Sequence, residues 1–209
     1  SFNHVYGSNS LLITNSGGGS GFRSFRYNNI FGSNIGDNLS WQAGGLNQYW
    51  SWNNVIGHES LRNFNFNGGS TTLGRVGYNN IIGFQIAGTS TSGSYNVFNG
   101  YQAGYSNVTG SYNISIGYSA GQVNMTGSRN IVIGYNRDVP SAAGNDQLVI
   151  GSNTDDWIIG DSSYNVGLGT ASPTSKLHVV GDVLVTGIVT ATDFNSTSDA
   201  KLKTNIQPI

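Results

Sequence analysis

The chain has no cysteine, and charged residues make up only 9% of its 209 residues. Without cysteine there are no disulfides and no thiolate metal sites, and any compartment is compatible with the chain. A formal net charge of −1 gives no electrostatic basis for binding nucleic acid or an acidic membrane. No apolar run approaches the length of a membrane-spanning helix. We therefore expect neither a nucleic-acid partner nor membrane insertion.

Glycine is abundant instead, with 31 residues, and it closes a recurring tract. Each tract holds an aromatic or polar residue, an amide, two or three mostly apolar residues and Gly. The nine tracts are FNHVYG (2–7), YNNIFG (27–32), WNNVIG (52–57), YNNIIG (78–83), YNVFNG (95–100), YNISIG (112–117), RNIVIG (129–134), DQLVIG (146–151) and YNVGLG (164–169). Successive closing glycines are 25, 25, 26, 17, 17, 17, 17 and 18 residues apart. Such a short period predicts a solenoid, whose small coils bury their apolar faces by stacking.

The columns of the repeat predict the structure of a coil. An amide stands four residues before every closing glycine, which favours either a hydrogen-bonded ladder between stacked coils or turn-forming Asn at the start of a strand. The residue before Gly is apolar or aromatic in all tracts but one, and in the later tracts the residue two earlier is apolar as well. This alternation predicts short strands with that face buried. The closing Gly would supply a positive φ or a close backbone approach at each corner.

The first coils are about eight residues longer than the later ones. Insertions in solenoids usually form loops on one face, often the binding face. These loops contain several aromatic residues, which could stack on a sugar or seal an interface between chains. We favour interface packing for the aromatic residues as a group. Any receptor contact is predicted here, at Trp41, Tyr49, Trp50 and His58.

Two strings resemble known repeats. NGYQAG (99–104) and IGYSAG (116–121), each preceded by YN, are similar to head repeats of trimeric autotransporter adhesins and to related repeats in bacteriophage tail fibres. The likeness is good over residues 78–151 and weaker before them. It implies an all-β fold, a homotrimer of left-handed parallel β-roll solenoids followed by an intertwined β-stem.

The next segment resembles a fibre stem. NVGLGTASPTSKLHVVGDVLVTG (165–187) is similar to the linker and stem that precede self-cleaving chaperone domains in phage fibres. Its β-branched residues alternate, and such a stretch would expose backbone edges unless three chains intertwine or it folds as an ordinary hairpin. We expect a β-roll at 1–157, with longer coils at 1–83 and 17-residue coils at 84–157. A neck and trimeric β-stem at 158–194 and the start of a chaperone at 195–209 would follow.

The last segment, STSDAKLKTNIQPI (196–209), resembles the opening of an intramolecular chaperone. The resemblance implies self-cleavage at the Ser198–Asp199 bond, with Ser198 as nucleophile and Lys203 as its base. Read without the family, Ser followed by DAKLK is a helix N-cap. The helical body of the chaperone is not in this sequence, so we expect a fragment of a longer polypeptide that is no enzyme by itself.

Other chemistry is sparse. The three histidines have no metal-like spacing, and we expect no cofactor and no metal. Asp155, Asp156 and Asp161 surround Trp157 and suit either a cation or, preferably, turn solvation.

These observations favour a structural trimeric fibre of a virion, most simply a phage tail fibre that contributes to host attachment. Its expected partners are two copies of itself, a host-surface receptor such as a glycan, and other virion tail proteins, and its expected location is extracellular. One alternative is the head of a bacterial surface adhesin of the trimeric autotransporter type, which would need a stalk and a membrane anchor. Another is a binder of extracellular polysaccharide or ice surfaces, which would need a flat array of identical columns.

Overall fold

The computed structural model describes residues 3–8, 13–14, 23–35, 39–41, 48–60, 65–66, 75–86, 93–123 and 126–190. Of residues 13–14, 23–26, 39–41, 48–51, 65–66 and 75–76 only the backbone is described. The described part is all-β and holds no helix, so no helix in it is long and apolar enough to cross a membrane.

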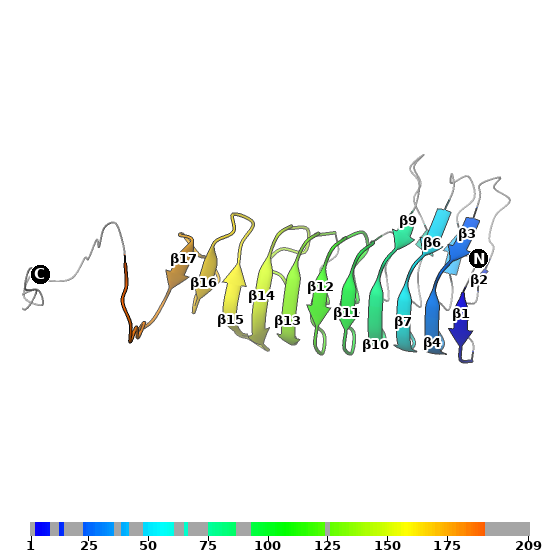
Figure 1. The fold of residues 1–209 in the computed structure, drawn as a ribbon, viewed down its shortest axis with the longest axis horizontal. Helices are drawn as coiled ribbons and strands as arrows, with labels where there is room; N and C mark the ends of the chain where they lie inside the picture. The colour runs from blue at the N-terminus through cyan, green and yellow to red at the C-terminus, as the bar shows by residue number, and fades with distance from the viewer. Residues whose placement is uncertain are drawn as a thin grey trace, which may run out of the picture.

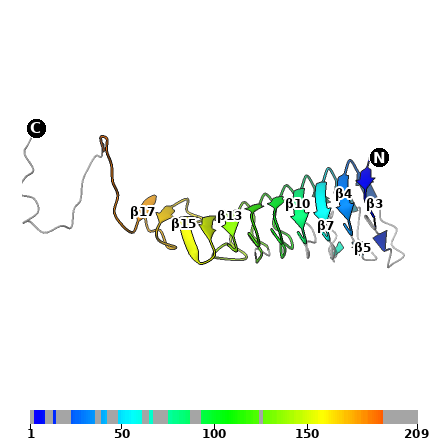
Figure 2. The same ribbon diagram turned by 90° about the horizontal axis from the view of Figure 1, so that it is seen from below.

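One long sheet of eleven strands runs along the molecule (Figure 1). In spatial order it consists of β1 (His4–Tyr6), β4 (Asn29–Ser33), β7 (Asn54–His58), β10 (Asn80–Phe84), β11 (Val97–Asn99), β12 (Ile114–Ile116), β13 (Ile131–Tyr135), β14 (Leu148–Ser152), β15 (Asp155–Gly160), β16 (Val166–Leu168) and β17 (Leu177–Val179). All nine predicted tracts form strands of this sheet. In the 17-residue coils the segments that connect the strands lie on one side of the sheet (Figure 2).

The register of the sheet repeats the alignment of the tracts. Val55 pairs with Ile30 on one side and with Ile81 on the other, and Ile131 pairs with Leu148. From β1 to β14 all pairs are parallel, so equivalent residues stand in columns. The prediction of stacked, half-buried strands is confirmed.

The longer N-terminal coils build two further parallel sheets. One contains β2 (Ile13–Thr14), β5 (Leu39–Trp41) and β8 (Asn65–Phe66), and the other contains β3 (Arg23–Arg26), β6 (Gln48–Ser51) and β9 (Arg75–Gly77). The insertions therefore continue the stacking and contribute strands of their own, where the sequence predicted loops.

The parallel run ends where β15 turns back. β15 pairs antiparallel with β14 and with β16, and the register shifts between Ile150 and Gly151. The ninth tract therefore stacks on β15 and not on the eighth. After β17, no strand is present in the described residues up to 190.

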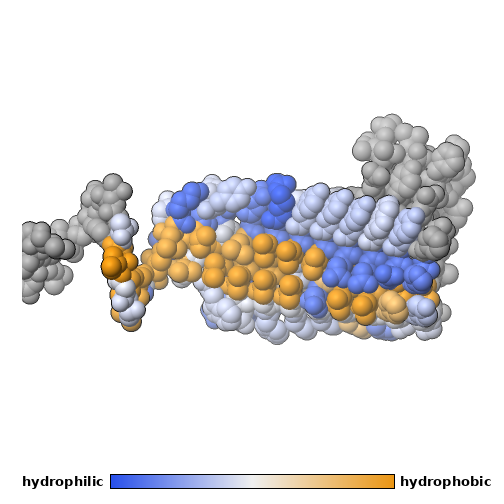
Figure 3. Space-filling model, viewed as in Figure 1, coloured by the Kyte–Doolittle hydropathy of each residue, from blue (hydrophilic) through white to orange (hydrophobic). Residues whose placement is uncertain are grey.

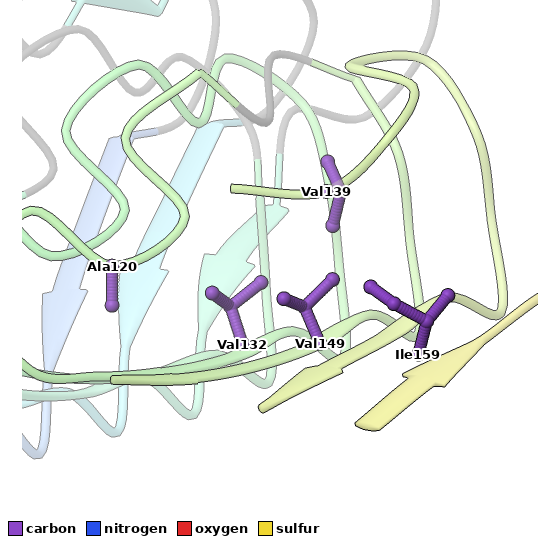
Figure 4. Close-up of a cluster of buried hydrophobic side chains, with 5 residues drawn as sticks. All are labelled: Ala120, Val132, Val139, Val149 and Ile159. Carbon is purple, nitrogen blue, oxygen red and sulfur yellow. The ribbon is translucent and has the colours of Figure 1, made fainter. Parts of the chain in front are cut away.

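The core consists of two columns of buried side chains, one from the strands and one from the segments that follow the closing glycines. From β4 to β14 the residue two before the closing Gly is buried, as at Ile30, Val55 and Val132. In the coils of β4 to β12 the residue three after the closing Gly is buried as well, as at Ile35 and Ala120. Phe98, the bulkiest residue of the middle column, lies in the same coil as the small, buried Ala103. Figure 4 shows the C-terminal end of this core, where Val132, Val149 and Ile159 lie in line.

The predicted buried face was the wrong one. Residues just before Gly lie outside the coil, with Phe31 42%, Ile56 40% and Ile116 39% exposed. The interior has room for one residue of each three-residue strand, and the middle one fills it.

The closing glycines have the role predicted for them. Gly117 has φ 128°, and a Cβ built on it would lie 2.1 Å from the carbonyl oxygen of Gly134 in the next coil. Any side chain at this column would separate the coils.

Candidate functional site

The candidate site is the outward surface of the long sheet, called here the outer face. It has two rows, because alternate strand residues share a face. The glycine-adjacent row holds Tyr6, Phe31, Ile56, Ile82, Asn99, Ile116, Ile133 and Ile150. The leading row holds His4, Asn29, Asn54, Asn80, Val97, Ile114, Ile131 and Leu148.

The outer face divides into a mixed half and an apolar half (Figure 3). Over β4, β7 and β10 the leading row consists of Asn29, Asn54 and Asn80, and the Nδ2 group of Asn54 donates to Oδ1 of Asn80 at 2.9 Å. From β11 to β14 the leading row is aliphatic. Neither row carries Lys, Arg, Asp or Glu. A partner would therefore bind this face through apolar contacts and shape complementarity, without ion pairs.

A buried amide ladder holds the strands in register beneath this face. Oδ1 of Asn96 accepts the backbone N–H of Asn113 at 2.9 Å, and Oδ1 of Asn113 accepts that of Asn130 at 2.9 Å. Nδ2 of Asn113 donates to the carbonyl of Gly127 at 2.8 Å. The same backbone bond joins successive amides from Asn3 to Gln147. Of the two readings of this column, the ladder is confirmed.

Stacked aromatic rings border the strands on both sides. One stack, just before the amide ladder, runs through Tyr27, Trp52, Tyr78, Tyr95 and Tyr112, with centroids 4.7–5.2 Å apart. The other, just after the closing glycines, runs through His58, Phe84, Tyr101, Tyr118 and Tyr135 at 4.8–5.5 Å. Ring faces cover one another, so the stacks present edges to solvent. A sugar that needs a free ring face is poorly served by such a surface.

The four predicted receptor residues do not form one described site. Trp41 lies in β5, and Tyr49 and Trp50 lie in β6, where only the backbone is described. His58 ends β7, with its Nδ1 2.6 Å from Oγ of Ser33 and its Nε2 3.6 Å from Oε1 of Glu59. Its ring stacks on Phe84. His58 is thus part of an aromatic column.

One ion pair, between Arg129 and Asp146, replaces rings at the C-terminal end of the first stack. Arg129 Nε donates to Asp146 Oδ1 at 2.6 Å, and Nη2 donates to Oδ2 at 2.8 Å. This hydrogen bonding and the charge of Arg129 lower the pKa of Asp146. By contrast, burial raises the pKa of Asp138, whose Oδ1 accepts the backbone N–H of Val123 at 2.8 Å.

Two of the three aspartates around Trp157, Asp156 and Asp161, bind other groups of the protein. Asp156 pairs with Arg137. Asp161 accepts backbone N–H groups of Ser163 and Asn165 at 2.9 and 3.0 Å, and these bonds, the Asn165 bond foremost, lower its pKa. Around Asp161 the preferred interpretation as turn solvation is confirmed. The described residues contain no group of three His, Asp or Glu side chains placed to hold a metal.

The predicted cleavage residues Ser198, Asp199 and Lys203 lie outside the described residues. Of the predicted neck and stem at 158–194, residues 158–190 are described and include β16 and β17. Residues 180–190 are exposed throughout, with Leu184 89% and Ile188 95% exposed.

Sequence reasoning missed the outer face. The available signal was that in the tracts from Tyr95 to Gly151 the middle column is apolar except at Ser115, and the rows beside it are apolar except at Asn99. Strands that are apolar on both sides are typical of sheets covered on both faces. Comparison of the chain with protein-family models, with curated proteins and with solved structures finds no match.

Proposed function

We propose that the chain is the rod of a homotrimeric virion fibre, most simply a phage tail fibre, in which the outer faces of three left-handed β-rolls pack together. The observation that carries the proposal is an uncharged, largely apolar face on the outside of coils whose interior is already filled. Exposed aromatic and aliphatic side chains follow one another along this face, among them Tyr6, Phe31, Ile56, Ile116 and Ile133. Contiguous exposed apolar surface of this kind marks an interaction site more often than a free monomer surface.

The spacing of the outer face favours copies of this chain as its cover. Its side chains recur with each coil, at about 4.8 Å along the sheet. A second rod with the same rise can match that spacing over the whole length, whereas a compact partner could contact only part of it. The exposed residues 183–189 at the C-terminal side add a segment that intertwined chains would bury as a β-stem.

Attachment to a host is the proposed task of the fibre. The N-terminal coils are the widest, because each has two additional strands: β2 and β3 in the first, β5 and β6 in the second, and β8 and β9 in the third. We place the receptor contact there, at Trp41, Tyr49 and Trp50. Single changes of these residues to Ala test this better than a deletion, since a deletion would remove paired strands. Loss of host-cell binding by an intact trimer supports the contact, and unchanged binding by all three variants rejects it.

The assembly is tested by light scattering of the purified chain at micromolar concentration. We expect three times the chain mass of 22.1 kDa. Ile133→Glu should give monomers, because it buries unpaired charges in an apolar interface. Thr109→Glu, which adds the same charge at an exposed position away from the strands, should remain trimeric. A wild-type chain of monomeric mass would refute the proposal.

A further inference from the structure

Asn99 is a single polar residue within the apolar half of the outer face. It stands in the glycine-adjacent row, paired in register with Ile82 on one side and Ile116 on the other. Its side chain is exposed and makes no hydrogen bond within the described part of the chain. The folded chain itself therefore gives no reason for an amide at this position.

The coils after Asn99 are nearly interchangeable. Ile116, Ile133 and Ile150 follow it in the glycine-adjacent row, and Ile114, Ile131 and Leu148 fill the leading row. Copies packed through such a face could slide by one coil, about 4.8 Å, and lose only the contacts of the end coil. Something in the face has to distinguish one register from the next.

We propose that Asn99 sets the axial register between copies by hydrogen bonding to Asn99 of the neighbouring copies; this inference rests on the trimer proposed above. An amide both donates and accepts, so like amides can pair around an axis. A slip by one coil would press each amide against an isoleucine and leave it desolvated and unpaired, which is costly. A single buried Asn fixes the register of coiled coils by the same logic.

The switch in the leading row reinforces this level. Asn80 and Val97 are register partners, so the leading row changes from amide to aliphatic at the step from β10 to β11. A slipped copy would therefore also place an amide of the Asn80 column beside an aliphatic side chain. The change in the leading row and the single Asn of the glycine-adjacent row thus both occur at β11.

The absence of cysteine makes a clean crosslinking test possible. Two precursors that include the downstream domain are coexpressed, one carrying Ile133→Cys and the other Ile150→Cys, and the purified trimers are joined through disulfides or a short thiol crosslinker. In the predicted register the products link like positions, 133 to 133 and 150 to 150. A slip by one coil links 133 to 150 instead, and mass spectrometry separates these products.

In the Asn99→Ile background we expect the share of 133-to-150 links to rise roughly tenfold or more. Asn99→Gln keeps an amide and should retain most of the selectivity. The double change Asn99→Ile with Ile116→Asn moves the amide by one coil and should restore like-to-like links. The role of Asn99 is refuted if trimers give the same link pattern with and without Asn99, or if they give no like-to-like link. Either result leaves the trimer proposal standing. Light scattering of the same samples separates this from failure of the trimer, which would show as monomers.

Discussion

At the residue scale, the closing glycines show how little space separates the coils. A Cβ at Gly117 would meet the Gly134 carbonyl, whereas one at Gly181, which also has positive φ at 137°, would meet nothing within 4 Å. Gly187 has neither constraint. Substitutions at Gly117, Gly181 and Gly187 therefore distinguish the cost of backbone strain from the cost of steric contact.

The three variants are compared in the monomeric Ile133→Glu background, where no partner chain covers residues 181 and 187. There we expect Gly187→Ala to change the unfolding free energy by less than about 0.5 kcal/mol. Gly181→Ala should cost about 1–3 kcal/mol through its strained φ alone. Gly117→Ala should cost more than Gly181→Ala, because strain and collision with backbone add there. Chemical denaturation of the three variants measures the order, and equal losses at 117 and 181 would contradict the contact.

The two perturbed carboxylates should give opposite pH dependences. Because the folded-state pKa of Asp146 is lowered, its stabilising contribution is present above the unfolded-state pKa and is lost as the pH falls through the folded value. Because that of Asp138 is raised, its contribution is present in acid and is lost as the pH rises through the folded value.

Asp146→Asn should therefore reduce the loss of stability on acidification below about pH 4. Asp138→Asn should stabilise the fold slightly at neutral pH and lose this advantage in acid, because the amide oxygen still accepts from Val123. Denaturant midpoints measured across pH 2 to 7 test both signs. The same slope change in both variants would contradict the assignment.

At the element scale, non-glycine residues in a left-handed conformation recur in the described coils in addition to the closing glycines. Tyr95 and Gln102 have φ of 61° and 52°, and their equivalents in other coils have similar values. A left-handed conformation is unfavourable for such residues, so contacts between coils have to hold it. For Tyr95 these contacts are the rings of Tyr78 and Tyr112.

Tyr95→Leu should cost about 1–3 kcal/mol, since it removes two ring pairs worth about 0.5–1.5 kcal/mol each. Tyr164→Leu is the matched control, as Tyr164 has φ 59° in the same column but is 72% exposed and makes no ring contact in the described structure. Thermal unfolding compares the variants, and near-ultraviolet circular dichroism reports the stack directly. Equal costs would mean that stacking adds nothing.

The strands themselves could be predicted from the sequence, because an amide and a glycine bracket each one. The buried side could not, because both sides are apolar and alternation alone does not say which one turns inward. Around β5 and β6 no amide stands four residues before a glycine, which is the spacing that marks the other strands, so these segments were expected as loops. β15 was missed for the same reason, and its antiparallel pairing depends on a register shift at Gly151.

At the scale of the whole molecule, the proposed assembly includes a chaperone that leaves after folding. Three chains that wind together lose much conformational entropy before their contacts form, so a template that is later cut off would make assembly effectively irreversible. Ser198 and Lys203 are the residues proposed to release it.

In a precursor that includes the downstream domain, we expect cleavage between Ser198 and Asp199. Ser198→Ala and Lys203→Ala should each leave a trimer of full precursor mass, and Ser196→Ala, two residues earlier, should still be cut. Intact-mass spectrometry distinguishes these outcomes. A Ser198→Ala precursor that is cut at this bond removes Ser198 from the nucleophilic role.

Because the junction between coils is the same at each step, the length of the rod depends only on the number of coils. β12 pairs with β13 through the same register, amide bond and glycine approach that join β11 to β12. Duplicating one 17-residue unit in the gene would therefore add one rung without creating a new kind of joint. Length could change in whole steps of about 4.8 Å while both ends keep their structure. The length of the fibre is then set by the number of repeat units in the gene, and it can evolve without a change of fold.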